Sequence, residues 1–223
     1  MITALLPMKA NSERVPNKNF RLIGGKPLYY WMLETLFAIE VIDRVIVNTD
    51  ADEELFSNFI GNKKLVIRSR KPSICGDLVS MNKIIEDDVL SDHSNIFLMT
   101  HTTNPLISTK TLSNAIHIFV NRDKNKHDSL YSVTKFQGRF NYEGNVAINH
   151  NPNELLRTQD LPPVYLENSC LFLFEKSIFL ETKTRVGKKP ILFETPQLES
   201  IDIDTEDDWY LASLLISDKS QNK

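Results

Sequence analysis

The chain has 223 residues, of which 41% are hydrophobic and 25% are charged, as in an ordinary globular protein. Disordered, collagen-like and coiled-coil chains are therefore excluded. The 26 basic and 29 acidic residues leave a net charge of −3, without the basic excess of a nucleic-acid-binding protein. At a typical size of about 150 residues per domain, we expect one domain over residues 1–223.

The cysteines and the hydropathy of the chain exclude further classes of protein. Cys75 and Cys170 form no CxxC motif, so neither a zinc ribbon nor a disulfide framework is indicated. No apolar run approaches the roughly 18 residues of a membrane span. We therefore expect a soluble, cytoplasmic protein with neither nucleic acid nor a membrane as a partner.

The first 120 residues alternate short apolar runs with helical patterns. Strands are expected at Ile2–Leu6, Arg44–Asn48, Leu65–Ile67 and Ile96–Met99. Helices are expected from Pro27 and around Asp52–Ile60, Met81–Leu90 and Thr109–Asn121, and Lys9–Lys26 is expected to be a loop. This alternation favours right-handed crossovers and an α/β fold with a mostly parallel central sheet flanked by helices.

The pattern changes after Arg122. Ser129–Lys135 alternates with the period of a strand, Gly144–Asn149 resembles a hairpin arm, and Asn151–Pro163 is expected to be a loop. Two more strands are expected at Cys170–Phe174 and Ile191–Glu194, and then a terminal helix at Glu206–Ile216 with frayed residues after it. The C-terminal half is therefore expected to carry an antiparallel insertion.

A polar loop with several cations follows the first strand directly. Lys9, Arg14 and Lys18 stand in the segment KANSERVPNKN, with Asn11 and Ser12 between them. Ligands of open α/β sheets bind at the carboxyl ends of the strands, and several cations with free backbone donors suit a polyphosphate. The segment KANSERVPNKN has no glycine, so a GxGxxG dinucleotide site or a P-loop is disfavoured. A solvated charged loop is the alternative interpretation.

Two aspartates precede the terminal helix in the segment SIDIDTEDD. In an extended chain, residues two apart point to the same side at a spacing of about 7 Å, so Asp202 and Asp204 could share a hard cation. The alternative is a capping role, in which Thr205 caps the helix and acidic residues 206–208 complement its dipole. The functional interpretation requires that this pair and the cationic loop, about 190 positions apart, meet in one pocket.

Other polar residues at strand ends have ordinary structural interpretations. Asp77 and Ser80 lie in a turn before a helix, and Arg70 could contact a nucleobase or pair with Asp77. His101 follows a strand without the serine and aspartate partners of a catalytic triad. The segments RTQD and YLENS, at 157–160 and 165–169, are by themselves a polar loop before a strand.

Several segments together resemble one family, the acylneuraminate cytidylyltransferases (CMP-sialic acid synthetases), and more distantly the Kdo cytidylyltransferases. MKANSERVPNKN is similar to the family's ARxxSKGxPxKN, and GGKPLYYW is similar to its GxPL-W helix start. VNTD resembles VSTD, THTTNP resembles QxTSP, and ENSCLFLF resembles ENGSFYF. SIDIDTEDDW resembles SIDIDTExD most strongly, and the matches span nearly the whole chain in order.

The resemblance implies a Rossmann-like nucleotidyltransferase fold with an antiparallel dimerisation arm at about residues 134–166 and a homodimer. It implies transfer of CMP from CTP to the anomeric hydroxyl of a nonulosonic (sialic-acid-like) acid, with release of pyrophosphate. Magnesium would be held by Asp202 and Asp204, and the implied catalytic residues are Lys9, Arg14, Lys18 and Asp202. The implied nucleotide contacts are Lys9, Asn11, Ser12, Arg14, Lys18, Asn19, Arg70, Asp77 and Ser80. The implied acceptor contacts are His101, Thr103, Arg157, Gln159 and Asn168, and the last three could reach the sugar across a dimer interface.

Three departures fall on positions that the resemblance assigns to substrates. Lys9 replaces the usual arginine, His101 replaces a glutamine, and Leu166 stands where some bacterial members have an arginine. The acceptor is therefore open among N-acetylneuraminate, deaminated neuraminate, legionaminate, pseudaminate and Kdo. Two alternative functions stay open as well: another sugar nucleotidyltransferase, and a nucleotide-binding regulatory protein without catalytic activity.

Overall fold

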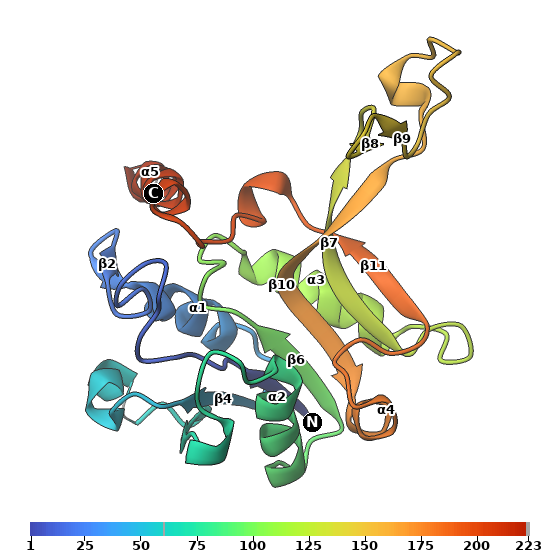
Figure 1. Ribbon diagram of the computed structural model, residues 1–223. Helices are drawn as coiled ribbons and strands as arrows, with labels where there is room; N and C mark the ends of the chain where they lie inside the picture. The colour runs from blue at the N-terminus through green and yellow to red at the C-terminus, as the bar shows by residue number, and fades with distance from the viewer. Residues whose placement is uncertain (60, 222–223) are drawn as a thin grey trace.

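The centre of the molecule is a seven-stranded sheet in the order β11-β7-β10-β6-β1-β4-β5, seen in the computed structural model of Figure 1. The structure describes residues 1–59 and 61–221. The strands are β1 (Ile2–Leu5), β4 (Arg44–Thr49), β5 (Leu65–Ser69), β6 (Ile96–Thr100), β7 (Ser129–Phe136), β10 (Val164–Glu175) and β11 (Pro190–Glu194). Among these described strands, β10 alone runs against its neighbours, and the remaining pairs are parallel. The expected α/β class and mostly parallel sheet are confirmed.

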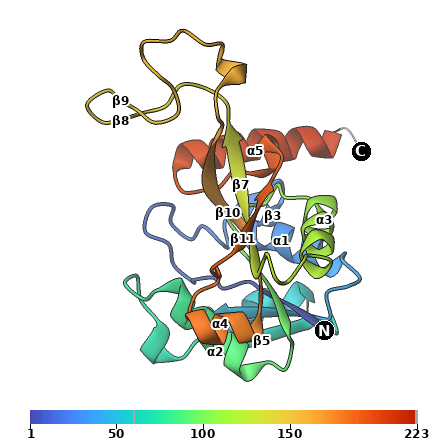
Figure 2. The ribbon, with the colours of Figure 1, turned by 90° about the vertical axis from the view of Figure 1, so that its right-hand side faces the viewer.

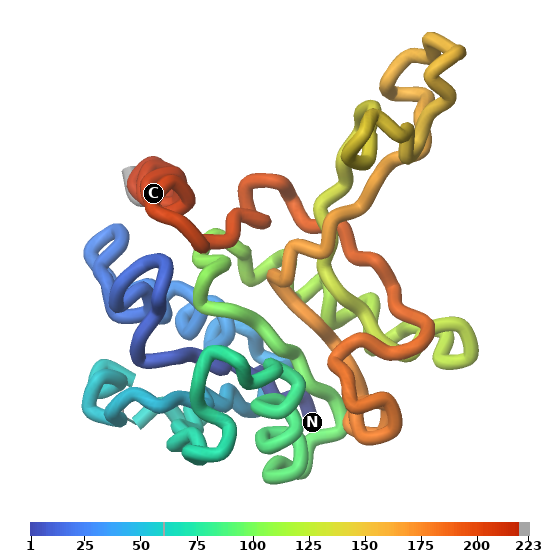
Figure 3. Tube along the Cα trace, in the orientation of Figure 1, coloured from blue at the N-terminus to red at the C-terminus, as the bar shows by residue number. Residues whose placement is uncertain are grey.

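Helices cover both faces of this sheet, as Figures 2 and 3 let the reader follow. α1 (Leu28–Phe37) and α3 (Thr109–Val120) pack over one hydrophobic cluster, and α2 (Met81–Ser91) and α4 (Lys176–Thr182) pack over another. Side chains alternate between the faces along the first strand, because Ala4 joins the first cluster and Leu5 the second. α5 (Glu206–Gln221) buries Trp209 and Ile216 in a third cluster with Val15 and Ile203.

Several short elements were not expected from the sequence. The expected loop Lys9–Lys26 contains a small hairpin, β2 (Leu22–Ile23) and β3 (Lys26–Pro27), and Pro27 is the residue before α1 rather than its first residue. The helix expected at Asp52–Ile60 is the 3-10 helix η1 (Glu53–Phe59), and Ile60 lies outside the described residues. The other short helices are η2 (Pro72–Ile74), η3 (Thr158–Asp160) and η4 (Gln197–Glu199).

A long extension between β7 and β10 projects away from the sheet in both ribbon views. It contains a second small hairpin, β8 (Asn141–Tyr142) and β9 (Val146–Ala147), followed by η3. Apolar side chains stand in solvent along it, since Tyr142 is 65% exposed and Leu155 is 94% exposed. The segment lies within the expected arm at residues 134–166; that it mediates dimerisation stays a prediction.

Candidate functional site

The loop after β1 encloses a polar cavity of about 170 Å³ at the carboxyl end of the sheet. Six residues that the sequence assigns to the nucleotide line it together: Lys9, Asn11, Ser12, Arg14, Lys18 and Asp77. Lys9 contacts Asp77, and hydrogen bonds from Lys9 and with Glu13 lower the pKa of this exposed carboxyl. Three cationic side chains, those of Lys9, Arg14 and Lys18, therefore line one cavity, as a polyphosphate site requires.

The cationic loop meets the acidic segment before α5. The buried Lys18 donates a 2.6 Å hydrogen bond to the Ile203 carbonyl, and its Nζ lies 3.4 Å from Asp204 Oδ1. Arg14 Nη2 lies 3.0 Å from the same carboxylate oxygen. The structure thus brings together the two segments that the sequence singles out, although they lie far apart along the chain.

A second cavity, of about 310 Å³, lies on the other side of this acidic segment. Asp202 lines it together with Asn168, Glu167 and residues of β7 and of the segment after β11. Asp202 Oδ1 is buried and has no hydrogen-bond partner among the described residues. Burial raises the pKa of Asp202; a hydrogen bond with Thr103 opposes this shift, and the charge of Asp204 adds to it. Asp202 therefore lines the second cavity and also has a buried carboxylate oxygen without a hydrogen-bond partner among the described residues.

Asn168 is fixed by the fold at the edge of this second cavity. Its amide nitrogen donates to Thr134 Oγ1 at 3.0 Å and to Thr195 Oγ1 at 2.6 Å. The next residue, Ser169, has a φ of 56°, where β10 shifts its register against β7. This irregularity directs residues of β10 into the cavity, as bulges beside ligand sites commonly do.

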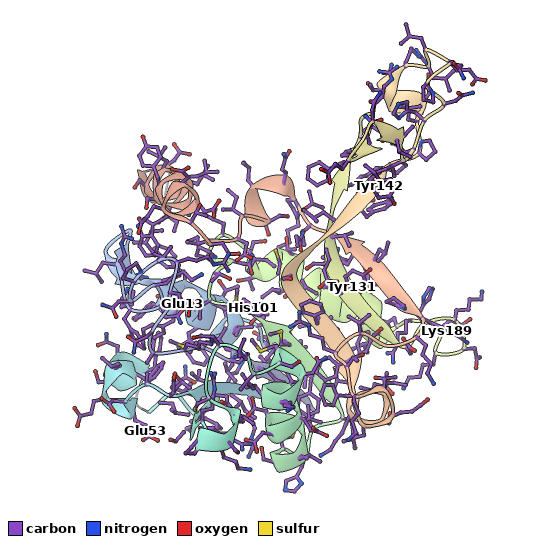
Figure 4. The ribbon with its side chains drawn as sticks, in the orientation of Figure 1. Glu13, Glu53, His101, Tyr131, Tyr142 and Lys189 are labelled. Atoms are coloured by element: carbon purple, nitrogen blue, oxygen red, sulfur yellow. The ribbon has the colours of Figure 1, made fainter. Side chains whose placement is uncertain are left out.

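His101 lies near the middle of the molecule, between the loop that carries Glu13 and the strand that carries Tyr131 (Figure 4). Burial lowers the pKa of His101 to about 3, and the charges of Arg185 and Lys18 contribute to the shift. The imidazole is therefore neutral near pH 7. It can donate or accept one hydrogen bond, as the amide of the glutamine usual at this position does.

Three residues that the resemblance assigns to the nucleotide make hydrogen bonds within the fold. Asn19 donates to the Lys9 carbonyl at 2.7 Å and accepts from Thr102 at 2.6 Å, so it shapes the loop. The buried Arg70 donates to Asn48 and to the Met8 carbonyl. Ser80 caps α2 through Asn82 N.

One of these positions, Arg70, had two alternative contacts in the sequence interpretation. Of the two alternatives left open for Arg70, the pairing with Asp77 is not the one observed, because Asp77 contacts Lys9. The Arg70 side chain is only 5% exposed, and its bonds tie the segments that follow β1 and β5 to β4. The contact of Arg70 with the nucleotide stays a prediction. No motif in the sequence distinguishes a buried structural arginine from an exposed one.

The structure does not bring Arg157 and Gln159 to either cavity of their own chain. Arg157 lies on the projecting arm, where its guanidinium pairs with Asp160 at 2.7 Å in solvent. Gln159 is exposed in the same 3-10 helix. Their implied contact with the acceptor, across a dimer interface, stays a prediction.

The capping interpretation of the acidic segment also holds. Asp208 N donates to Thr205 Oγ1 at 3.2 Å, and Thr205 N donates back to Asp208 Oδ2 at 2.8 Å. This reciprocal cap begins α5 and engages Asp208. Asp204 contributes only its backbone N–H, which donates to Asp208 Oδ2 at 3.1 Å, so the cap does not use the carboxylates of Asp202 and Asp204.

No group of three or more metal-ligating side chains occurs among the described residues. Asp202 and Asp204 still fit a magnesium ion, because magnesium is commonly held by one or two carboxylates together with substrate phosphates. The buried, unpartnered Asp202 Oδ1 is the observation that supports this fit.

Cations and carboxylates that meet at the carboxyl end of a mostly parallel sheet define a nucleotide-binding α/β protein. Residues 3–206 match the family model described as cytidylyltransferase, and the chain belongs to this family. N-acylneuraminate cytidylyltransferase of Streptococcus agalactiae is 23% identical over 210 residues, which cover 92% of this chain and 51% of that protein. The chain thus spans about half the length of that relative.

Relatives of similar length exist too. Pseudaminic acid cytidylyltransferase of Campylobacter jejuni is 24% identical, with 95% of this chain and 94% of that protein covered. CMP-N,N'-diacetyllegionaminic acid synthase of Legionella pneumophila is 25% identical, with 96% of each covered. The solved structure of a CMP:2-keto-3-deoxy-manno-octonic acid synthetase complexed with CTP shares the fold at a TM-score of 0.69 and 12% identity, covering 98% of this chain and 99% of that chain.

Proposed function

We propose that this protein is a nucleotidyltransferase that transfers CMP from CTP to the anomeric hydroxyl of a nonulosonic acid and releases pyrophosphate. The family match and the relatives that are named for sialic, pseudaminic and legionaminic acids support the reaction class. The observation that carries the proposal is the contact of Lys18 with the Ile203–Asp204 segment, which lies between the two cavities.

The loop cavity suits the triphosphate. Lys9, Arg14 and Lys18 face it, and each is paired with a carboxylate of the protein, Asp77 or Asp204. Phosphate oxygens would take over these pairings and draw the cations onto the charge that develops during transfer. Lys9 supplies charge without the planar fork of the usual arginine, so it would bind phosphate as a point charge.

The cavity beside Asp202 suits the acceptor. The anomeric oxygen forms a bond to the α-phosphorus while the bond to the pyrophosphate oxygen breaks, and pyrophosphate leaves with that electron pair. Burial raises the pKa of Asp202, which makes its carboxylate the better acceptor for the hydroxyl proton. Magnesium bound by Asp204 and Asp202 would neutralise phosphate charge.

A homodimer belongs to this proposal. The exposed apolar residues of the arm, Tyr142 and Leu155 among them, favour burial against a second copy. A partner's arm is also the route by which Arg157 and Gln159 would reach an acceptor cavity. Among the described residues no helix is both long and apolar enough to cross a bilayer, and we propose a cytoplasmic location.

Pyrophosphate release with CTP and the panel of five sugar acids tests the reaction. Asp204→Ala should lower turnover at least about 100-fold, the scale for loss of one electrostatic group, while the thermal unfolding midpoint stays near wild type. Asp207→Ala is the matched control, because it removes an exposed carboxylate three positions away in α5. Wild-type rates with magnesium in the Asp204 variant would remove the metal assignment.

A thermal-shift panel with CTP, UTP, GTP and ATP separates this proposal from another sugar nucleotidyltransferase. Only the true nucleotide should raise the unfolding midpoint strongly. CTP binding without pyrophosphate release for any acid would favour a regulatory protein instead.

A further inference from the structure

One arginine near the second cavity lacks the partners that the other buried arginines have. Arg185 lies between α4 and β11, and its side chain is only 19% exposed. Its guanidinium stacks on the Phe172 ring at 3.8 Å, and Nη1 lies 3.8 Å from the Met99 sulfur. Among the described residues it donates no hydrogen bond to an oxygen, and Glu167 Oε1 lies at 3.9 Å.

The contrast with two other arginines shows that this is unusual for the fold. Arg70 makes three hydrogen bonds to oxygen, and Arg122 donates to Glu175 and to two backbone carbonyls. A guanidinium offers five donors and stays charged, so a desolvated one without oxygen partners is costly to hold. Aromatic stacking fixes the plane of Arg185 and leaves its donors available to a ligand.

The surroundings place this guanidinium at the acceptor side of the site. Its nearest carboxylate, Glu167, lines the cavity that also contains Asp202 and Asn168. The triphosphate side is occupied by a separate set of cations in the loop after β1. Glu167 would repel a polyphosphate more strongly than a single carboxylate, which carries one charge and matches the guanidinium in geometry.

We propose that Arg185 is a specificity-determining residue that binds the carboxylate of the acceptor through paired N–H donors. Glu167 is then the weak counter-ion that the acceptor carboxylate replaces. This inference rests on the proposed function, because it assumes an acceptor that carries an acid group beside its reacting hydroxyl. The segment between α4 and β11, which carries none of the motifs noted in the sequence, would then determine the choice between acid and neutral sugars.

The test compares the active sugar acid with its C1 carboxamide in the pyrophosphate assay. Wild type should prefer the acid by about 100-fold in kcat/KM, as expected for hydrogen bonds to a charged group in a buried site. Arg185→Gln should reduce this preference below about tenfold, raise KM for the acid, and leave KM for CTP within about twofold of wild type. Arg185→Lys should be intermediate, because it keeps the charge and loses the fork.

Two controls separate this role from folding and from net charge. Lys188→Gln removes an exposed charge of the same segment that pairs with Glu181, and it should behave as wild type. Thermal unfolding monitors the fold, and if Arg185→Gln does not fold, Arg185→Lys decides the question. An unchanged acid preference, or an equal rise in KM for CTP and for the acid, would overturn the inference. A wild type that is inactive with every acid would overturn the proposed function itself, and this inference with it.

Discussion

Replacing Lys18 by methionine tests whether the two halves of the site are joined as described. The change keeps most of the buried stem and removes the ammonium that bonds to the Ile203 carbonyl at 2.6 Å. Loss of a charged donor from a buried carbonyl costs about 1.5–3 kcal/mol, and the 3.4 Å contact to the partly exposed Asp204 adds at most about 1 kcal/mol. We expect a loss of about 2–3 kcal/mol in the free energy of unfolding. For a chain of this length, that lowers the unfolding midpoint by about 4–12 °C.

Arg14→Gln is the matched control for this change. Arg14 contacts the same oxygen of Asp204, but its side chain is 68% exposed, so the ion pair contributes at most about 1 kcal/mol. Both variants should lose most of the stabilisation that CTP gives in a thermal-shift assay, because each removes one charge from the loop cavity. Equal stability losses in the two variants, or none for Lys18→Met, would refute the reasoning.

Three further predictions concern titration and assembly. Burial raises the pKa of Asp88 to about 6, so the folded state keeps a proton that the unfolded chain loses near pH 4. Stability should therefore fall by about 3 kcal/mol as pH rises from about 4 to about 6, and Asp88→Asn should remove this slope in urea titrations. The pKa of His101 is lowered to about 3, so the unfolded chain binds the proton first. The stability that the neutral His101 contributes is therefore complete above about pH 6.5 and is lost as the pH falls towards 3. His101→Gln should flatten the plot of unfolding free energy against pH over this range. An unchanged plot would contradict the burial of His101. Leu155→Asp on the arm should shift the mass measured by light scattering from dimer to monomer with the unfolding midpoint preserved, and a wild-type monomer would contradict the proposed assembly.

Elements with strong local signals were predictable from the sequence. The apolar run at Ile2–Leu6 became β1, and the helical spacing around Met81–Leu90 and Thr109–Asn121 became α2 and α3. The outer half of β10 was not predicted, because residues 164–169 (VYLENS) do not alternate between apolar and polar and form a strand by pairing with β7. Strand propensity there depends on the tertiary partner more than on the residues themselves.

In the candidate site, too, some residues could be predicted from the sequence and others could not. The loop residues from Lys9 to Lys18 follow one strand directly, so their shared cavity could be inferred from the position of the loop. The partners of Arg70 could not be predicted, because its bonds are to backbone carbonyls and to an asparagine on another strand. Arg185 was missed because it stands in a polar segment whose contacts to β6 and β10 arise only in the folded chain.

The continuity of β10 constrains how this protein can diverge. β10 begins at the root of the projecting arm, opposite Phe136, shifts its register against β7 near Ser169, and ends in the buried sheet. Insertions beyond Phe136 and before Val164 leave that ladder unchanged, so the tip is free to vary in length. Adding a single residue between Val164 and Asn168 would turn the following side chains to the opposite face. The tip of the arm can therefore change in length during evolution, whereas residues 164–168 tolerate only changes that keep the alternation of side chains between the two faces of β10.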